Sequence, residues 1–427
     1  MTQWLMIVSA LTLVVVTLGQ FTAEPPAEKR ALGDLVWELK DPQASIRLRA
    51  AKDLGKLDQG AKDAVPALIL ALDDIDSGVR AASAKALGEM SAAAKAAVPA
   101  LVRRLKDDKV SRSEGSVWVA VSQALGSIGA DAAPQLIEAL DPAIPRQFIG
   151  AAVALHDIRS AARDAVPVLI RALEHDHPRI RKASIFALGG IGPEAKIAVP
   201  ALTKMLKHED FHTQSYACRA LGEIGPAAKS AADELIRLTK EGVASVRCHA
   251  ATAIGNIGPA SGAGVVGPLV DLLNDHLHPV REDAAIALGK LGTLAKPAVP
   301  ALEKVIANQR LGVRVEAAKS VWLLTGRTEK VVPVLIEELK EFDHSIESAQ
   351  ALSEIGPPAK AAVTALVEAL KSSDSETRIQ AAEALGKIGL AEGAVPALEK
   401  ALRDEDVDVR AETKRALKRI KSSSQGP

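Results

Sequence analysis

Four histidines in two neighbouring turns are the residues of this sequence best suited to bind a metal ion. They are His175, His177, His208 and His212. Imidazole nitrogens are common ligands of zinc, which takes three or four protein ligands. Turn histidines more often serve as ordinary solvated side chains. We predict no metal site here, and a zinc ion at these turns is the alternative.

Signatures of other chemistries are missing from the sequence. It contains no Gly-rich phosphate loop, no G-x-S-x-G and no H-E-x-x-H. The sequence therefore predicts no catalytic residue and no cofactor-binding residue.

The elements that position these turns are copies of one unit, exemplified by Ala64 to Gly88. Pro66 suits the first turn of a helix, where its missing N–H has no partner. Three apolar residues follow at helical spacing: Leu68, Ile69 and Leu72. The next three aspartates can cap a second helix: Asp73, Asp74 and Asp76. We predict that this second helix ends at Gly88, where a residue without Cβ can turn sharply.

Copies of the unit fill most of the chain. The proline position recurs every 31 to 35 residues, and the start of the second helix recurs twelve times, as Arg47, Arg80, Trp118, Phe148, Arg181, Gln214, Arg247, Arg281, Arg314, Ser345, Arg378 and Arg410. One helix pair cannot bury its apolar stripe alone, whereas stacked pairs can. The sequence predicts an all-α fold, an α-solenoid (superhelix) of about twelve two-helix repeats over residues 31–421.

The pattern AVPALxxALxDxDxxVRxxAAxALGxIGPxAK, which extends from about Ala31 to Ile420, resembles the HEAT repeat. It is most similar to the short bacterial form of the phycobilin lyase group. The resemblance implies a non-enzymatic scaffold or adaptor that binds protein partners. The alternative is a HEAT-like enzyme or enzyme subunit, similar to a phycobilin lyase or to deoxyhypusine hydroxylase.

The hydroxylase alternative requires His-Glu pairs that hold two irons at the starts of second helices. The equivalent positions of this sequence read Arg247-Cys248-His249, Arg281-Glu282-Asp283 and Arg314-Val315-Glu316. None is a His-Glu pair, and His208-Glu209 lies in a turn. The ligand count therefore disfavours a di-iron centre.

The recurring arginine stands at the N-terminal end of the second helix, where the helix dipole disfavours a cation. Aspartates recur just upstream and could compensate it. The resemblance to HEAT repeats implies a ladder of aspartate and arginine side chains between neighbouring turns. We therefore assign a structural role to Arg80, Arg181, Arg247, Arg281, Arg314, Arg378 and Arg410.

Departures from the repeat in copies three to six mark a candidate partner-binding face. Its members are Trp118, Phe148, His156, Phe186 and Tyr216. The loop before Trp118, Asp107 to Ser116, is five residues longer than usual. The resemblance places second helices on the concave face, where rigidly backed aromatic side chains can anchor a partner. The alternative is that these side chains repack the core, where we also expect Trp37 and Trp322.

The two cysteines, Cys218 and Cys248, fall on adjacent second helices, offset by about one turn. Neighbouring helix axes lie roughly 8–10 Å apart, and one turn adds about 5.4 Å. A disulfide needs Cα atoms within about 7 Å. We predict no disulfide, even in an oxidising compartment.

The N-terminal segment, residues 1–23, contains an uncharged apolar run from Trp4 to Leu18. This run is shorter than the roughly 20 residues of a membrane span and fits the core of a secretory signal. We predict a signal peptide and a secreted or periplasmic protein, with a retained membrane anchor as the alternative. Residues 24–30 are predicted to be a linker, and residues 422–427 a disordered tail.

Composition limits the classes of partner. The formal net charge is +0, and aromatic residues make up only 2% of the chain. Nucleic-acid binding depends on a basic surface and, for single strands, on aromatic stacking. We therefore expect protein partners and no nucleic acid, and a membrane only if residues 1–23 remain as an anchor.

Overall fold

The computed structural model describes residues 32–57, 59–308, 313–341, 345–389 and 393–424. The predicted signal or anchor (1–23) and linker (24–30) lie outside the described residues. Helix α25 (Val407–Ser424) continues past residue 421, so the tail predicted to begin at residue 422 is helical as far as Ser424. The chain divides into two units, residues 1–161 and 162–427, and each is described by itself.

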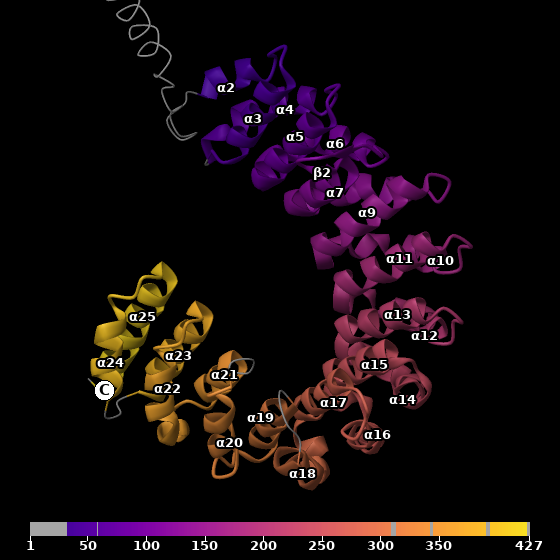
Figure 1. The fold of residues 1–427 in the computed structure, drawn as a ribbon. Helices are drawn as coiled ribbons and strands as arrows, with labels where there is room; N and C mark the ends of the chain where they lie inside the picture. Colours follow the sequence, from indigo (N-terminus) through magenta and orange to yellow (C-terminus); the bar gives the residue numbers. More distant parts are fainter. Residues whose placement is uncertain (1–31, 58, 309–312, 342–344, 390–392, 425–427) are drawn as a thin grey trace, which may run out of the picture. The chain divides into compact units, whose positions relative to one another are not determined.

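The first unit is a series of helix pairs with one small hairpin (Figure 1). Its elements are α2 (Leu32–Glu38), α3 (Ala44–Gly55), η2 (Gln59–Ala64), α4 (Val65–Ala71), α5 (Ser77–Glu89), η3 (Ser91–Ala97), α6 (Val98–Arg104), β1 (Val110–Ser111), β2 (Gly115–Ser116), α7 (Val117–Ile128), η4 (Gly129–Ala132), α8 (Ala133–Glu138) and α9 (Pro145–Ile158). The 3-10 helix η5 (Arg159–Ala165) follows at the division between the units.

The second unit continues the same alternation. Its elements are α10 (Val166–Ala172), α11 (Pro178–Ile191), η6 (Gly192–Ala198), α12 (Val199–Met205), α13 (Phe211–Ile224), η7 (Gly225–Ala231), α14 (Ala232–Glu241), α15 (Ala244–Ile257), η8 (Gly258–Ser261), η9 (Ala263–Val265), α16 (Val266–Leu272), α17 (His278–Lys290), η10 (Gly292–Ala298), α18 (Val299–Asn308), α19 (Val313–Thr325), α20 (Val331–Glu338), α21 (Ser345–Ile355), η12 (Pro357–Ala362), α22 (Val363–Ala369), α23 (Ser375–Ile388), α24 (Ala394–Ala401) and α25.

Helix starts follow the signals in the sequence. Pro66 lies in the first turn of α4, where its missing N–H leaves no bond unmade. The Asp76 side chain caps α5 by accepting hydrogen bonds from the amides of Gly78 (2.8 Å) and Val79 (3.0 Å). The predicted two-helix unit is thus confirmed at the level of its local interactions.

Within each unit, every second helix packs on the second helix of the next copy. The order is α3, α5, α7 and α9 in the first unit, and α11, α13, α15, α17, α19, α21, α23 and α25 in the second. Leucines at the equivalent core position, Leu87, Leu125 and Leu155 among them, are fully buried. The predicted α-solenoid is confirmed, because each pair gains its core from the next pair along the chain.

Gly88 has a different role from the predicted helix stop. It lies inside α5, which continues to Glu89. A Cβ at Gly88 would lie 2.9 Å from the Cα of Ala124 on α7, so this glycine permits the close approach of two second helices. In other copies the stop is a later glycine, such as Gly192, which caps α11 with a φ of +73°.

The long loop of the third copy forms a hairpin. Strands β1 and β2 pair antiparallel, with Val110 opposite Ser116 and Ser111 opposite Gly115. Gly115 has a φ of +79°, a left-handed conformation that glycine adopts without the steric cost of a Cβ. The hairpin therefore interrupts the helical repeat at one defined place in the first unit.

One described stretch, Pro178–Met205, is long and apolar enough to cross a membrane by length and composition. It comprises α11, η6 and α12, and its chain turns at Gly192. More than half of its most apolar window is buried inside the protein. These are core helices of the repeat stack, whose apolar faces are covered by their neighbours.

Candidate functional site

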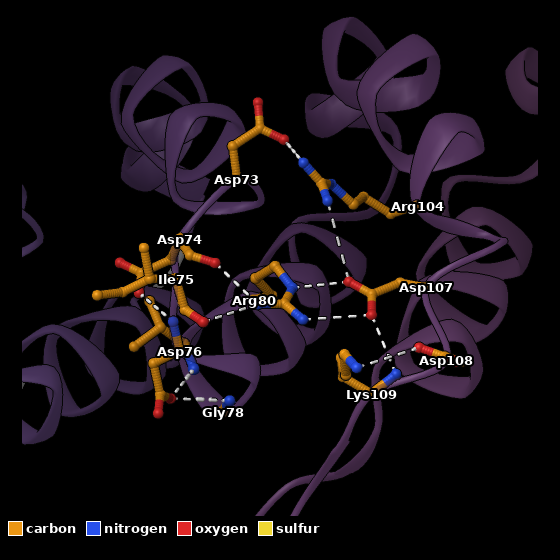
Figure 2. Close-up of polar contacts among 11 residues, drawn as sticks. Asp73, Asp74, Ile75, Asp76, Gly78, Arg80, Arg104, Asp107, Asp108 and Lys109 are labelled. Carbon is orange, nitrogen blue, oxygen red and sulfur yellow. Dashed lines mark hydrogen bonds and ion pairs between the residues drawn. The ribbon is translucent and has the colours of Figure 1, made fainter.

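Arg80 links two consecutive turns of the first unit (Figure 2). Its Nε and Nη2 donate to the two carboxylate oxygens of Asp107 at 2.7 and 3.2 Å. Its Nη1 donates to the main-chain oxygens of Asp74 (2.8 Å) and Ile75 (3.2 Å). The two side chains are 9% and 8% exposed, so this is a nearly buried bidentate pair that ties its own turn to the next one.

The same interaction recurs along both units. Bidentate pairs join Arg47 to Asp74, Arg247 to Asp275 and Arg378 to Asp404, with donor–acceptor distances of 2.6 to 3.0 Å. Arg314 instead contacts Glu337 and Glu338, at 2.6 and 2.7 Å. The four arginine–aspartate pairs, with that of Arg80 included, and the Arg314 contact with two glutamates form what we call the ladder.

Three arginines assigned to the ladder lack such a pair among the described residues. Arg181, Arg281 and Arg410 bond through Nη1 to main-chain oxygens of their own turns. The Nε atoms of Arg181 and Arg281 are buried without a hydrogen-bond partner in the described part of the chain. Arg410 belongs to the last predicted copy, where the described chain supplies no following turn.

The gap at Arg181 has a cause in the sequence. Asp107 stands 27 residues after Arg80, and the same step from Arg181 leads to His208. The Nδ1 of His208 accepts from the amide of Asp210 at 3.0 Å, just as Asp74 accepts from Asp76 at 2.8 Å. His208 therefore preserves the turn but offers Arg181 no carboxylate.

Replacing His208 with aspartate should complete the ladder and stabilise the second unit. We expect a free energy of unfolding about 1 kcal/mol higher than that of His208→Asn, because only aspartate adds a charged acceptor for Arg181. Urea denaturation of both variants measures the difference. The gain should vanish when Arg181 is replaced with glutamine, and equal stability of the aspartate and asparagine variants would contradict the proposed gap.

Phe148 does not lie on a surface. It is fully buried, among the largest side chains with no exposed area, which corrects its assignment to the partner-binding face. On α9 it shares a helix face with Ala152 and Leu155, which are also fully buried. The arginine position it occupies is itself nearly buried, since Arg80 is only 7% exposed. Phe148 thus replaces a buried ion pair with apolar packing.

The other two candidates in the first unit are partly exposed. Trp118 lies in the first turn of α7, and its main-chain oxygen accepts from the Ser122 hydroxyl at 2.8 Å. His156 lies in the last turn of α9, with Nδ1 2.9 Å from the Asp157 carboxylate. With Phe148 buried, these two are the remaining candidates of the partner-binding face in the first unit.

Helix α13 of the second unit carries two exposed aromatic side chains. Tyr216 is 36% exposed and Phe211 is 42% exposed. The Phe211 ring stacks on His212 with centroids 4.0 Å apart, and His212 lies one turn before Tyr216 on the same helix face. Phe186 on α11 is half-buried.

Sequence analysis placed Trp37 in the core, and this is wrong, because its side chain is 71% exposed. Leu35 in α2 and Leu39, just after the helix, are buried and lie about one turn apart. A residue halfway between them in sequence faces the opposite side of the helix. This periodicity was the signal that could have placed Trp37 outside. Trp322 is half-buried.

Tyr216 belongs to a column of polar side chains across five consecutive second helices. The position two residues after the arginine position holds Tyr216, His249, Asp283, Glu316 and Glu347, on α13, α15, α17, α19 and α21. We call these five residues the Tyr216 column. Glu347 and Tyr216 are exposed, and the three between them are half-buried. Sequence analysis compared three of these positions with metal ligands but did not recognise them as one surface.

The middle of the Tyr216 column holds carboxyl groups that are partly removed from water. Burial raises the pKa of Asp283, although hydrogen bonds with Cys248 and Thr252 and the nearby His249 act in the opposite direction. Burial also raises the pKa of Glu316, opposed by Lys319 and reinforced by the charge of Glu282. A cation placed beside either carboxyl group would stabilise its ionised form.

The two cysteines are free thiols. Burial raises the pKa of the Cys218 thiol to about 12. Burial, with the Asp283 carboxyl beside it, raises the pKa of Cys248 to about 12. Since the thiolate is the nucleophile, neither cysteine is poised for nucleophilic chemistry at neutral pH.

The turn histidines serve the backbone. His175 accepts through Nδ1 from the amide of His177 (3.0 Å), and His177 accepts from the amide of Arg179 (3.2 Å). Within the described residues, no group of three or more histidine, cysteine, aspartate and glutamate side chains could hold a metal ion. The local hydrogen bonds account for the imidazoles that suggested zinc.

Sequence comparison identifies the repeats. The family model of HEAT repeats matches residues 33–119, 166–245, 235–322 and 328–418. The model of the PBS lyase HEAT-like repeat matches residues 119–142, which include α7 and α8. No curated protein matches the chain.

Among solved structures, importin beta crystallised in an ammonium sulfate condition is similar. The match has a TM-score of 0.62 and 14% identity, and covers 92% of this chain and 63% of that chain. Kap95p, whose binding induces the switch loops of RanGDP to adopt the GTP-bound conformation, gives a TM-score of 0.50 and 14% identity over 92% of this chain and 61% of that chain. The chain thus spans less than two thirds of these proteins, and the likeness concerns the fold. Because its family match extends over most of the solenoid, the chain belongs to the HEAT-repeat family.

Proposed function

We propose that this protein is a non-enzymatic interaction scaffold that binds a segment of a partner protein along the Tyr216 column. The observation that carries the proposal is the repetition of one half-exposed position over five adjacent second helices. Such a row gives an extended chain a series of contact points at regular spacing. Tyr216, with His212 one turn before it on the same helix face, supplies an aromatic anchor at one end.

The chemistry of the column favours a partner segment that carries lysine or arginine. The raised pKa values of Asp283 and Glu316 mean that burial disfavours their ionised forms. A cation from a partner would compensate that cost and bond to the carboxylates. An acidic partner segment would instead meet repulsion from Glu347 and Glu316.

Ladder pairs brace two of the helices that carry the column. Arg247 on α15 binds Asp275, in the turn that leads into α17, at 2.8 and 3.0 Å. Arg314, on α19, binds Glu337 and Glu338 at the end of α20. Preorganised backing of this kind lowers the ordering cost of binding. The structural neighbour Kap95p, which binds RanGDP, offers a precedent for protein binding by this fold.

The test is site-specific photo-crosslinking in the native host, with the crosslinking amino acid at position 216 and, as control, at Ile75. Ile75 is 94% exposed but lies in a turn of the first unit. We expect a protein adduct from position 216 that is absent from position 75 and is reduced at least about tenfold by Asp283→Asn/Glu316→Gln. Adducts of equal yield from both positions, or adducts unaffected by the double substitution, would remove the proposal.

A further inference from the structure

The hairpin of the first unit lies beside α5 and α7 (Figure 1) and contacts the two preceding copies through one side chain. Its Glu114 carboxylate lies 2.6 Å from the Nζ of Lys52 on α3 and 2.9 Å from the Nζ of Lys85 on α5. Lys85 also donates to the main-chain oxygen of Glu114 at 3.1 Å. One carboxylate of the third copy is therefore held by lysines from the first and second copies.

The Glu114 side chain is one of the residues that line a cavity. The cavity has a volume of about 190 Å³ and is lined by Lys52, Lys56, Ala82, Lys85, Ala86, Glu89 and Glu114. The Glu114 side chain is only 5% exposed, whereas those of Lys52 and Lys85 remain 44% and 43% exposed. The lysines therefore present ammonium groups to solvent as well as to Glu114.

The hairpin is partly exposed outside its Glu114 contact. Val110 is 67% exposed, and the tip is organised by its own Ser111 hydroxyl, which accepts from the amides of Ser113 and Glu114. A second cavity of about 380 Å³ separates β1 from the first turns of α3 and α5. The ion pairs of Glu114 therefore tie this partly exposed hairpin to the two preceding copies.

The lysines favour the ionised form of Glu114. Burial of the carboxylate acts to raise its pKa, but hydrogen bonds from Lys52 and Lys85 outweigh burial, and the pKa lies below its usual value. The lysine pair thus stabilises a carboxylate in its charged form.

We propose that Lys52, Lys56 and Lys85 form a binding site for a glutamate- or aspartate-containing segment of a partner protein, and that Glu114 occupies this site as an internal substitute ligand. Glu114 lies in the insertion that distinguishes the third copy from the others, and this insertion places its carboxylate beside the lysines. The partner is acidic because the site already binds a carboxylate with two lysines, and lysine recognises anions as a point charge. This site lies in the first unit and does not depend on the Tyr216 column.

An acidic segment must displace the hairpin in order to bind. Removing the Glu114 carboxylate should therefore strengthen binding of the segment. The probe is a fluorescein-labelled peptide in which glutamate and serine alternate. Fluorescence anisotropy measures its binding to the full chain. Because a tethered ligand competes at high effective concentration, we expect Glu114→Gln to bind the peptide roughly tenfold more tightly than the unsubstituted protein. Adding Lys52→Gln and Lys85→Gln should return binding to background.

The matched control is Lys95→Gln in the Glu114→Gln protein. Lys95 also pairs with a carboxylate in the first unit, Asp131 at 2.6 Å, but lies outside the cavity, so peptide affinity should not change. Equal affinity of Glu114→Gln and the unsubstituted protein, with unchanged circular dichroism, would show that Glu114 is only a structural brace. Tighter binding of an alternating lysine–serine peptide would also overturn the proposal.

A second measurement uses the unsubstituted protein, so it does not depend on the folding of any variant. Saturating glutamate–serine peptide should accelerate hydrogen exchange of the amides between residues 110 and 116, because the hairpin is released. Unchanged exchange of this segment under saturation would overturn the displacement of Glu114.

Discussion

Replacing Asp107 with alanine should lower the free energy of unfolding by about 3 kcal/mol. The substitution leaves the Arg80 guanidinium nearly buried, with only the main-chain oxygens of Asp74 and Ile75 as acceptors. Removal of one partner of a buried ion pair is costly because the remaining charge is desolvated without compensation. Urea denaturation of the full chain, followed by far-UV circular dichroism, measures the loss.

The control for this prediction is the adjacent Asp108→Ala. The Asp108 side chain is 62% exposed, and its only ion pair among the described residues, with Lys109, is 3.9 Å long. We expect a change of less than about 0.5 kcal/mol, as for most exposed pairs. Equal stability of the two alanine variants would show that the Arg80–Asp107 pair contributes no more to stability than an exposed ion pair does.

The same pair predicts how stability depends on pH. Burial acts to raise the pKa of Asp107, but hydrogen bonds from Arg80 and the Lys109 amide outweigh it, and the pKa lies below its ordinary value of 3.8. Because the folded-state pKa is depressed, the contribution is fully present above the ordinary value and is lost as pH falls through the folded-state pKa. The stability difference between the unsubstituted protein and Asp107→Asn should therefore shrink below about pH 4.

Replacing Phe148 with alanine should lower the free energy of unfolding by about 4 kcal/mol. The side chain is fully buried, and large-to-small substitution of a buried phenylalanine loses transfer free energy and leaves a cavity. Phe148→Leu should lose about half as much, because leucine fills part of the same space. Thermal and urea denaturation of both variants provide the measurement.

Trp118→Ala is the matched comparison for Phe148→Ala. Both residues stand at the arginine position of adjacent copies, but Trp118 is half-exposed. We therefore expect Trp118→Ala to cost less than Phe148→Ala, by about 2 kcal/mol. A larger cost for Trp118→Ala would contradict the assignment of Phe148 to the core and of Trp118 to its edge.

The repeat itself could be predicted from sequence because its signals are local. Pro66 marks the start of a helix, Asp76 caps the next one, and apolar residues follow at helical spacing. A pair with an unburied stripe must stack on a similar pair. These signals all lie within about one repeat length, so they recur at the repeat period and can be recognised in the sequence.

Side-chain exposure could not be predicted in the same way. Trp118 and Phe148 align with the same position of the unit, yet one is half-exposed and the other fully buried. The repeat period aligns the two positions, but the neighbours that cover each side chain belong to other copies, and the period does not specify them.

The sequence by itself determined that this protein is a stack of helix pairs, because proline, aspartate caps and apolar periodicity specify each pair locally. Only the tertiary structure decided which side chains meet between copies. Arg80 reaches Asp107, Gly88 meets Ala124, and Glu114 reaches Lys52 across 62 residues of sequence. The physical reason is that contacts between copies depend on how one helix is rotated and placed against the next, and packing of the whole neighbourhood sets that geometry.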